Sequence, residues 1–269
     1  MLIELKNVSF TYPNGPKAVD KVSLSIGRGE FIALIGHSGA GKTTLAKLIV
    51  GLLKPKTGWV KVGDLDTKTT PVSKIAEHVG YVFQNPDLMI FSATIYDEVA
   101  FALRNRGYGE DEIKKRVVQA LKEVDLGHKP LDTPPYMLSF GEKHRLAIAS
   151  VLATEPDLLI LDEPTTGLDY ARCLKIMEIC ERLVKKGKSV LIITHDFGLI
   201  AEYASRVLVM KKSRIIRDGV TKDVLGDVEF LKSEGFMPLQ STLLARKLGV
   251  NAITPRELAS TILEKKALK

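Results

Sequence analysis

The segment GHSGAGKT, residues 36–43, constrains the fold more than any other part of the sequence. It follows the apolar run FIALI, which predicts a strand over residues 30–35, and it opens a helical pattern from about Lys42. A strand, a glycine-rich turn and a helix in this order let backbone N–H groups converge on one point. Because the helix N-terminus adds partial positive charge there, the segment predicts a phosphate-binding loop.

The segment also contains the complete spacing G-x-x-x-x-G-K-[ST], and we call it the P-loop. Lys42 is expected to reach the β and γ phosphates of a nucleotide, and Thr43 to ligate magnesium. The alternative, a merely flexible glycine turn, is disfavoured because the strand and the helix flank the segment directly. The predicted nucleotide contacts are Gly36, His37, Ser38, Gly39, Ala40, Gly41, Lys42, Thr43 and Thr44.

Two adjacent acids, Asp162 and Glu163, follow the apolar run LLIL. Adjacent acids at a strand end are common, but these lie downstream of a P-loop in a parallel-sheet pattern. The carboxyl ends of parallel strands meet at the ligand-binding edge of such a sheet. We therefore predict that Asp162 holds the magnesium ion through a water molecule and that Glu163 polarises the attacking water.

The remaining pattern predicts an α/β fold. Two nearly unbroken apolar runs, DLLILD and SVLIIT, flank a helical segment of about residues 170–186, which indicates a parallel sheet covered on both faces. Residues 84–153 are mostly helical in pattern and predict an inserted helical subdomain, and the strand pattern fades near Asp218. Further strands are expected at residues 2–10, 22–26, 58–62, 78–83 and 206–210.

Composition narrows the class of protein. Hydrophobic residues make up 45% and charged residues 26%, as in ordinary globular domains, and no apolar stretch approaches the ~18 residues of a membrane-spanning helix. The N-terminus alternates like a strand instead of resembling a signal peptide, so we expect a cytoplasmic protein that reaches a membrane through partners. Cys173 and Cys180 are expected to be reduced packing residues.

The formal net charge of +7 is concentrated near the C-terminus, where residues 241–269 carry six Lys or Arg residues against Glu257 and Glu264. A basic end can approach anionic lipid or nucleic acid. No aromatic residue lies between these positions to stack on a base, so we expect no nucleic-acid partner.

The pentapeptide LSFGE, residues 138–142, precedes a helical pattern and is compatible with an ordinary capping box of Ser139 and Glu142. It also resembles the signature LSGGQ of the ABC ATPase family. In that family the signature lies roughly two dozen residues before the metal-binding aspartate, and Ser139 and Asp162 are 23 residues apart. The resemblance implies that Ser139, Phe140, Gly141 and Glu142 act on the ATP held by a partner subunit.

Other segments between residue 1 and about residue 217 extend the resemblance in the family's order. Gln84 matches the Q-loop glutamine, which contacts magnesium, and His195 matches the catalytic switch histidine. Asp169 is the last residue of a segment that matches the D-loop of the family. Tyr12 matches the aromatic residue that stacks on adenine. Individually each has an ordinary structural alternative: a surface histidine, a loop amide or a half-buried strand tyrosine. Their joint order favours the family.

The resemblance implies an ABC cassette with an antiparallel β subdomain and a helical subdomain over residues 1–220, followed by a C-terminal helical extension over residues 221–269. In this family two ATPase subunits bind head to tail, with ATP and Mg²⁺ between them. Pro255, at the first turn of a helix opened by Thr254, supports the helical extension. The extension is expected to contribute to dimer contact.

Within the family, the chain is most similar to the ATPases of energy-coupling-factor (ECF) importers and their cobalt-uptake relatives. These include LSFGE variants, and their FQNP segment, here FQNPDLMIFSATIYDEVAFAL, docks onto a transmembrane coupling protein. Leu88 and Met89 replace the usual acid and glutamine, which suggests a more apolar contact. The resemblance implies a second ATPase subunit, a coupling protein and a substrate-binding membrane protein, with a vitamin or transition metal ion as cargo.

Three other functions stay open from the sequence. A conventional ABC transporter would use partners with long transmembrane domains. A soluble ABC protein acting on nucleic acid or ribosomes usually carries two cassettes or a coiled-coil insertion, which are not found here. A regulatory module without hydrolysis would be expected to have altered Glu163 or His195, and both residues are present.

Overall fold

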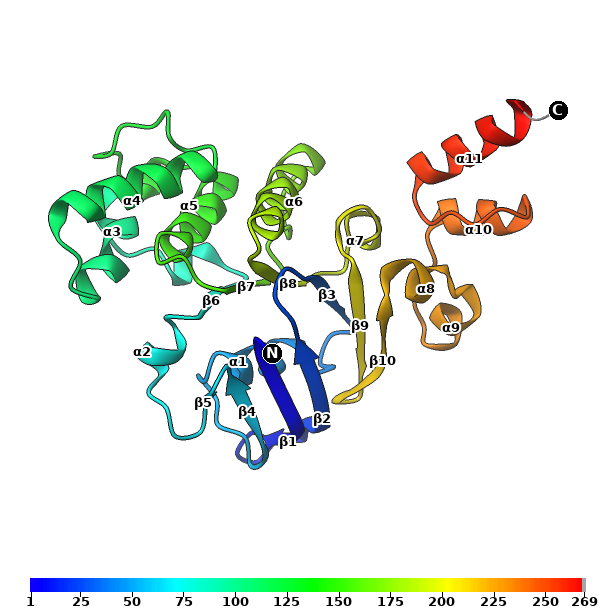
Figure 1. Cartoon of the computed structure of the whole chain (residues 1–269), viewed down its shortest axis with the longest axis horizontal. Coiled ribbons are helices and arrows are strands. Elements are labelled where there is room, and N and C mark those ends of the chain that lie inside the picture. Colours follow the sequence, from blue (N-terminus) through cyan, green and yellow to red (C-terminus); the bar gives the residue numbers. More distant parts are fainter. Residues whose placement is uncertain (268–269) are drawn as a thin grey trace.

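The computed structural model describes residues 1–267 and contains two sheets that share the P-loop helix between them (Figure 1). Lys269, one of the basic residues near the C-terminus, lies outside the described residues. The strands are β1 (Ile3–Thr11), β2 (Lys17–Ile26), β3 (Phe31–Ile35), β4 (Thr57–Val62), β5 (Leu65–Asp66), β6 (Val79–Val82), β7 (Leu158–Asp162), β8 (Ser189–Ile193), β9 (Arg206–Lys211) and β10 (Arg214–Val220).

The larger sheet has the strand order β10-β9-β3-β8-β7-β6, and β9, β3, β8, β7 and β6 run parallel. Every residue of β3, β7 and β8 is buried, as expected when helices cover both faces. This confirms the α/β fold with a parallel sheet. The carboxyl ends of β3 and β7 lead into the P-loop and into Glu163, so the topology brings these segments to one edge.

The smaller sheet is antiparallel, with the order β2-β1-β4-β5. It lies below the larger sheet in Figure 1, and the helix α1 (Lys42–Ile49) packs between them. One apolar cluster contains Leu45 and Ile49 of α1 together with buried residues of both sheets. The P-loop helix is therefore held on two sides by apolar packing, which fixes its N-terminus.

The helices on the left of Figure 1 form a separate layer beyond β6. They are joined to the parallel sheet by one continuous apolar cluster. The helices and short 3-10 turns between β5 and β7 are α2 (Val72–Ile75), η1 (Pro86–Leu88), α3 (Ile95–Asn105), α4 (Glu110–Glu123), η2 (Pro135–Met137) and α5 (Phe140–Leu152). Helix α4 begins with three acids in its first turn, which complements the helix dipole.

The C-terminal extension lies at the opposite end of the molecule from α3, α4 and α5 (Figure 1). Phe230, Phe236 and Leu239 pack against the main apolar cluster, whereas Ala245, Ala252 and Leu258 form a small cluster of their own. The helices after β7 are α6 (Tyr170–Lys185), α7 (Phe197–Tyr203), α8 (Thr221–Gly226), α9 (Val228–Ser233), α10 (Gln240–Lys247) and α11 (Pro255–Ala267).

Several local predictions are confirmed. Ser139 and Glu142 form the predicted capping box at α5, and Thr254 Oγ1 accepts from Glu257 N–H at the start of α11. Cys173 and Cys180 are both free thiols and buried. Within the described part of the chain, every helix is too short or too polar to cross a bilayer.

The last strand, β10, ends at Val220, close to Asp218 where the strand pattern fades in the sequence, but β10 itself was not predicted. This strand pairs antiparallel with β9 at the sheet edge, and most of its residues are exposed or half-buried. An edge strand carries polar residues on its solvent side, so its hydrophobic alternation is weak. Strand β2 likewise begins at Lys17, earlier than the predicted residue 22, and α2 and β5 were not predicted.

Candidate functional site

The P-loop leaves β3 at Gly36 and enters α1 at Lys42. Gly41, the N-cap of α1, has a φ of 105°, and a Cβ at this position would lie 2.1 Å from the Ala18 carbonyl oxygen. A Cβ at Gly36 would lie 2.2 Å from the Met210 carbonyl oxygen. Only glycine fits these two positions, because the neighbouring backbone approaches too closely for any side chain. The loop is thereby pressed onto β9 and exposes His37, Ser38 and Gly39.

Lys42 is buried and is the only positively charged side chain that the P-loop itself supplies. Its Nζ donates to the Gly36 carbonyl oxygen at 2.6 Å and to the His37 carbonyl oxygen at 3.3 Å. Burial lowers the pKa of Lys42, and the nearby charges of Glu163 and Asp162 act in the opposite direction. The ammonium group is thus held inside the loop, where phosphate oxygens can replace the carbonyl oxygens as acceptors.

Asp162, at the end of β7, is 3% exposed. Its Oδ2 accepts a hydrogen bond from the hydroxyl of Tyr81 at 2.9 Å, whereas its Oδ1 is buried without a protein partner. A buried carboxylate oxygen without a partner costs free energy unless water or a cation satisfies it. Oxygen donors of this kind suit Mg²⁺, so the residue fits the predicted metal role.

Glu163 follows Asp162 with a left-handed φ of 51°, which is unusual for a glutamate. Its backbone N–H donates to the Ile193 carbonyl oxygen at 2.8 Å, which fixes this conformation between β7 and β8. The side chain is largely buried, and its Oε1 lies 2.7 Å from Nε2 of His195. Burial raises the pKa of Glu163, an effect that the charge of Lys42 opposes.

His195 follows β8 and is exposed on the side away from Glu163. Desolvation lowers the pKa of His195, and the charge of Lys42 adds to this effect. Nε2 of the imidazole is thus the ring nitrogen that faces the Glu163 carboxylate. Both side chains line a hollow of about 610 Å³ that also includes Thr194 and Leu168.

Tyr12, at the end of the first strand, lies beside the helix that follows the P-loop. Its hydroxyl is 3.3 Å from Thr44 Oγ1, and its ring packs edge-on against Phe10 with the centroids 5.0 Å apart. The ring is 39% exposed, so one face is available to a flat ligand. The structure thus brings Tyr12, which directly follows β1 of the antiparallel sheet, to the P-loop helix.

The segment LSFGE lies at the N-terminus of α5. Ser139 N–H donates to Glu142 Oε2 at 2.8 Å, Glu142 N–H donates to Ser139 Oγ at 3.4 Å, and Glu142 Oε1 pairs with Lys129 at 2.7 Å. These bonds, the one from Lys129 first, lower the pKa of Glu142 to about 2. Both carboxylate oxygens of Glu142 are thus engaged within this chain.

Phe140 and Gly141 contact the loop before α6. A Cβ at Gly167 would lie 3.5 Å from Phe140 Cε1, and one at Gly141 would lie 2.9 Å from Arg172 Cδ. Asp169 caps α6 by accepting the Arg172 N–H at 2.9 Å. The phenyl ring of Phe140 is 43% exposed and faces solvent beside this loop.

Gln84 follows β6 and is exposed. Its backbone carbonyl accepts a hydrogen bond from Nε2 of the fully buried His144 at 3.2 Å, which links the segment to α5. The Gln84 segment and the LSFGE segment are therefore tied together inside the helical layer, while Lys42, Asp162 and Glu163 lie at the edge of the parallel sheet.

A family model described as ABC transporter matches residues 19–166, which is more than half of the chain. This chain belongs to the ABC transporter family. A provisionally named ABC transporter ATP-binding protein of Caldanaerobacter subterraneus subsp. tengcongensis is 46% identical over 97% of this chain and 46% of its own length. Another from Pyrococcus horikoshii is 40% identical over 94% of this chain and 95% of its own length.

The chain spans about half the length of the first curated ABC transporter relatives it matches. Among solved structures, it resembles cbiO1 from Clostridium perfringens, described as part of the ABC transporter complex cbiONQ, with 38% identity and a TM-score of 0.78 over 86% of this chain and 93% of that chain. It also resembles the dimeric ABC cassette MJ0796, with 31% identity and a TM-score of 0.74 over 81% of this chain and 98% of that one. The fold is that of an ABC ATPase cassette.

Within this ABC cassette, the predicted site residues fall into two groups. Glu163 and His195 line one hollow, His195 also lines a second hollow with Gly36, His37 and Ser38 of the P-loop, Asp162 directly precedes Glu163, and Tyr12 lies against Thr44 of the P-loop helix. The signature residues and the Q-loop glutamine lie in or beside the helical layer, and Phe140 and Gly141 of the signature also lie against the D-loop. The roles assigned to these residues from the sequence stay predictions.

Two residues of the cassette's site were missed by sequence reasoning. Tyr81 holds Asp162, yet it lies in a short strand, where a tyrosine is usually a packing residue. Ser213 N–H donates to the Ala40 carbonyl oxygen at 3.1 Å and supports the P-loop from the β9–β10 turn. Lys212 and Ser213 both have a left-handed backbone conformation, and their sequence indicates only an ordinary turn.

Proposed function

We propose that this cassette is the ATP-binding and ATP-hydrolysing subunit of an ECF-type ABC importer. It would bind ATP and Mg²⁺, work as a dimer with a second ABC ATPase subunit, and couple hydrolysis to uptake of a vitamin or a transition metal ion. Its place would be the cytoplasmic face of the cell membrane, as a peripheral protein held there by a transmembrane coupling protein and a substrate-binding membrane protein.

One observation supports the chemistry of hydrolysis above the others. A buried lysine and two acids share the edge beside the P-loop, and one of the acids lies 2.7 Å from a histidine nitrogen. Lys42 and the loop N–H groups would bind the phosphates, and Glu163 would orient and polarise the attacking water. Its raised pKa makes Glu163 a better proton acceptor than a solvent-exposed glutamate. His195 would hold the carboxylate in place.

The metal site would be formed by Thr43, Gln84 and Asp162. Bound Mg²⁺ would supply charge neutralisation at the β and γ phosphates. The partnerless Oδ1 of Asp162 supports this assignment, because it needs a polar neighbour that the protein does not provide. The hydroxyl of Thr43 is at the exposed start of α1, where it can reach the ligand.

The dimer is supported by the solved relative MJ0796, which is dimeric. In a head-to-tail pair, Ser139 and the Gly141 N–H of one subunit would face the ATP bound by the other. Because Glu142 is held by Ser139 and Lys129, it would shape the signature rather than reach the nucleotide. A heterodimer would have two unequal sites if its second subunit had a different signature.

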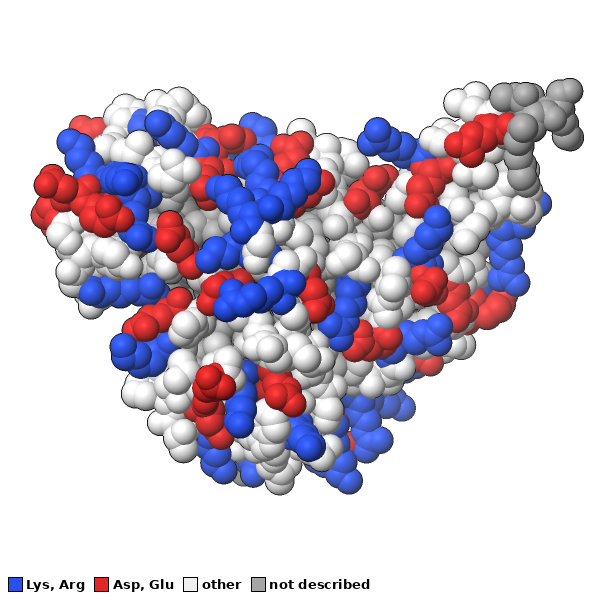
Figure 2. Space-filling view, viewed as in Figure 1, with Lys and Arg blue, Asp and Glu red and all other residues white. Residues whose placement is uncertain are grey.

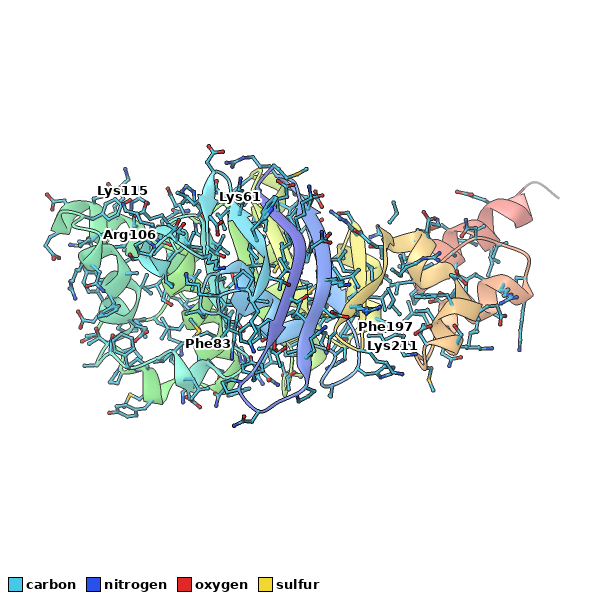
Figure 3. The ribbon with its side chains drawn as sticks, turned by 90° about the horizontal axis from the view of Figure 1, so that it is seen from below. Lys61, Phe83, Arg106, Lys115, Phe197 and Lys211 are labelled. Carbon is cyan, nitrogen blue, oxygen red and sulfur yellow. The ribbon has the colours of Figure 1, made fainter. Side chains whose placement is uncertain are left out.

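The coupling protein would dock in an apolar groove between the Q-loop segment and α3. The groove has a volume of about 310 Å³. Phe91 is 65% exposed and Phe101 is 46% exposed, and their rings pack edge-on with centroids 4.8 Å apart. Leu52, Val72, Phe83 and Met89 add apolar surface around them. Figure 3 labels Phe83 and Arg106, two lining residues, on the side of the helical layer.

The groove is held rigid by buried Glu98 of α3, which accepts the N–H groups of Phe91 and Ser92 at 3.0 and 2.8 Å. A rigid, exposed aromatic pair is typical of a protein-binding site. An apolar helix from a membrane protein fits this surface, in keeping with the apolar Met89 in its lining and the exposed Leu88 next to it in the chain. The groove lies on the segment that resembles the ECF docking region.

The test is to recover the tagged chain from gently solubilised membranes and to identify the proteins that come with it. A small integral membrane protein together with a second ATPase supports the ECF assignment, whereas a partner with a long fused transmembrane domain would indicate a conventional ABC transporter. Phe91→Ser should abolish recovery of the membrane partner. The matched control is Val220→Ser, which alters an equally exposed apolar residue on β10.

A further inference from the structure

The C-terminal extension directly contacts the P-loop. The rings of His37 and Phe236 are stacked, with centroids 4.5 Å apart and planes 3° from parallel. His37 Nε2–H also donates to the carbonyl oxygen of Glu234 at 3.0 Å. A side chain at the phosphate-binding loop is therefore held at its ring face and at its ring nitrogen by residues about 200 positions later in the chain.

The end of α9 places Phe236 in this position. Gly235 has a φ of 81°, and its N–H donates to Lys232 O at 3.0 Å, while Phe236 N–H donates to Leu231 O at 2.8 Å. These two bonds form a Schellman C-terminus, which turns the chain sharply and fixes the direction of the next residue. A Cβ at Gly235 would lie 3.4 Å from His37 Nε2, so the turn itself lies against the histidine.

Two contacts on the cassette side keep this segment in place. Lys211 pairs with Glu234 at 2.7 Å, and Phe197 packs against Phe236 with the centroids 5.7 Å apart. Lys211 ends β9 and Phe197 begins α7, and both are labelled where the sheet meets the extension in Figure 3. The extension segment is thus anchored to the parallel sheet independently of the P-loop.

The backbone of His37 leads directly to the phosphate-binding lysine. The His37 carbonyl oxygen accepts from Lys42 Nζ at 3.3 Å and from Ala40 N–H at 3.0 Å. The same residue therefore contacts the extension with its side chain and shapes the P-loop with its main chain. A displacement of the imidazole would move the carbonyl that faces Lys42.

We propose that Phe236 is a positioning residue for the nucleotide site: the end of α9 holds His37, and through it the P-loop, in the shape that accepts phosphate. This inference rests on the proposed ATP binding and goes beyond it, because it makes nucleotide affinity depend on the extension. Energetic coupling between two sites is reciprocal. Nucleotide on the P-loop therefore stabilises the end of α9.

The first test measures nucleotide affinity and steady-state hydrolysis in Phe236→Ala. Loss of one half-exposed aromatic pair predicts a dissociation constant and a KM for ATP about fivefold higher. The kcat should stay within about twofold, because the ring contacts and the hydrogen bond described for His37 and Phe236 are made with each other, with Phe197 and with Glu234, and not with Glu163. Phe236→Tyr keeps the ring and should restore affinity. Met237→Ala, the neighbouring exposed residue, is the control.

The double variant with His37→Asn separates positioning from general destabilisation. If Phe236 acts through His37, the loss in the double variant equals that of His37→Asn alone. Additive losses, or unchanged affinity in Phe236→Ala, would overturn the proposal. Thermal unfolding of each variant shows whether the chain stays folded.

A second test uses the unaltered full chain and so does not depend on the folding of a variant. Hydrogen exchange at residues 231–236 should slow about threefold or more when ADP or ATP with Mg²⁺ is added, as linkage requires. If the nucleotide protects the P-loop but leaves residues 231–236 unchanged, the inference is wrong while the proposed function stands. If the P-loop itself is not protected, the proposed ATP binding fails instead.

Discussion

His195 Nε2 lies 2.7 Å from Glu163 Oε1, and the two residues have opposite pKa shifts. Desolvation raises the pKa of the carboxyl and lowers that of the imidazole, so a neutral ring faces a carboxylate that is unusually ready to accept a proton. An uncharged imidazole can hold the water-activating carboxylate in one orientation. Because the ring carries no positive charge, the carboxylate keeps its ability to accept a proton.

The first prediction is that Glu163→Gln keeps ATP binding and loses turnover by ~10² or more, because the amide cannot accept the proton of the attacking water. Equilibrium nucleotide binding and phosphate release are measured side by side. Glu155→Gln, an exposed surface glutamate, is the matched control. Unchanged steady-state hydrolysis in Glu163→Gln would remove this residue from its proposed role.

A second prediction concerns the pH dependence of kcat. The base must be ionised, and burial raises its pKa above the ordinary value of 4.5. Turnover is therefore fully present above the raised pKa and is lost as the pH falls through it, at a higher pH than an exposed glutamate would give. A kcat profile whose acid limb has its midpoint at or below the ordinary glutamate value would contradict the prediction.

Lys42→Ala is expected to weaken nucleotide binding by about tenfold or more, because a charged hydrogen bond to phosphate is lost in the ground state. The variant also removes a buried ammonium that contacts two carbonyl oxygens of the P-loop. Titration with a fluorescent nucleotide checks this, and Lys47→Ala on the same helix is the control. Intact affinity would overturn the assignment of Lys42.

The parts of the fold that could be predicted from the sequence are those whose physical cause is local. The apolar runs of β3, β7 and β8 are buried on both faces, so their sequences carry no polar interruption. The P-loop spacing is set by glycine positions where a neighbouring backbone leaves no room for a Cβ. The capping box of α5 needs only two residues of one segment.

The parts that could not be predicted depend on contacts between distant segments. Tyr81 and Asp162 are brought together by the pairing of β6 with β7, and the sequence of either strand is compatible with plain packing. The contact of Phe236 with His37 joins the end of α9 to the P-loop. Strand β10 gains its hydrogen bonds from β9, while its own sequence mixes polar and apolar residues without a buried face.

Tyr81 provides the next prediction, because its hydroxyl donates to Asp162 at 2.9 Å while the other carboxylate oxygen stays free for a ligand. Burial and the Asp162 charge raise the pKa of Tyr81, so the hydroxyl keeps its proton at any ordinary pH. Tyr81→Phe should raise the Mg²⁺ concentration needed for half-maximal hydrolysis by about tenfold, as for other residues that orient a metal ligand.

The measurement is a Mg²⁺ titration of hydrolysis at saturating ATP, with Tyr136→Phe as control because Tyr136 is 77% exposed. Turnover at high Mg²⁺ should be close to that of the unaltered chain, since Asp162 itself remains. An unchanged Mg²⁺ requirement would show that Tyr81 only fills space beside β7.

Glu142 gives a prediction about stability rather than catalysis. Its carboxylate accepts the Ser139 N–H and pairs with Lys129, which lowers its pKa from 4.5 to about 2 in the folded chain. A folded-state pKa below the unfolded value stabilises the fold above the unfolded pKa, and this stabilisation is lost as the pH falls towards the folded pKa. Glu142→Gln keeps an oxygen acceptor for the cap but loses the charge.

We therefore expect Glu142→Gln to lower the free energy of unfolding by about 1 kcal/mol at neutral pH, given the partial exposure of the ion pair with Lys129. Urea unfolding at a series of pH values should show this difference narrowing as the pH falls from about 4.5 to about 2. Glu4→Gln, an exposed glutamate of β1, is the control. A difference that is independent of pH would mean that side-chain shape, and not the charge of Glu142, stabilises the start of α5.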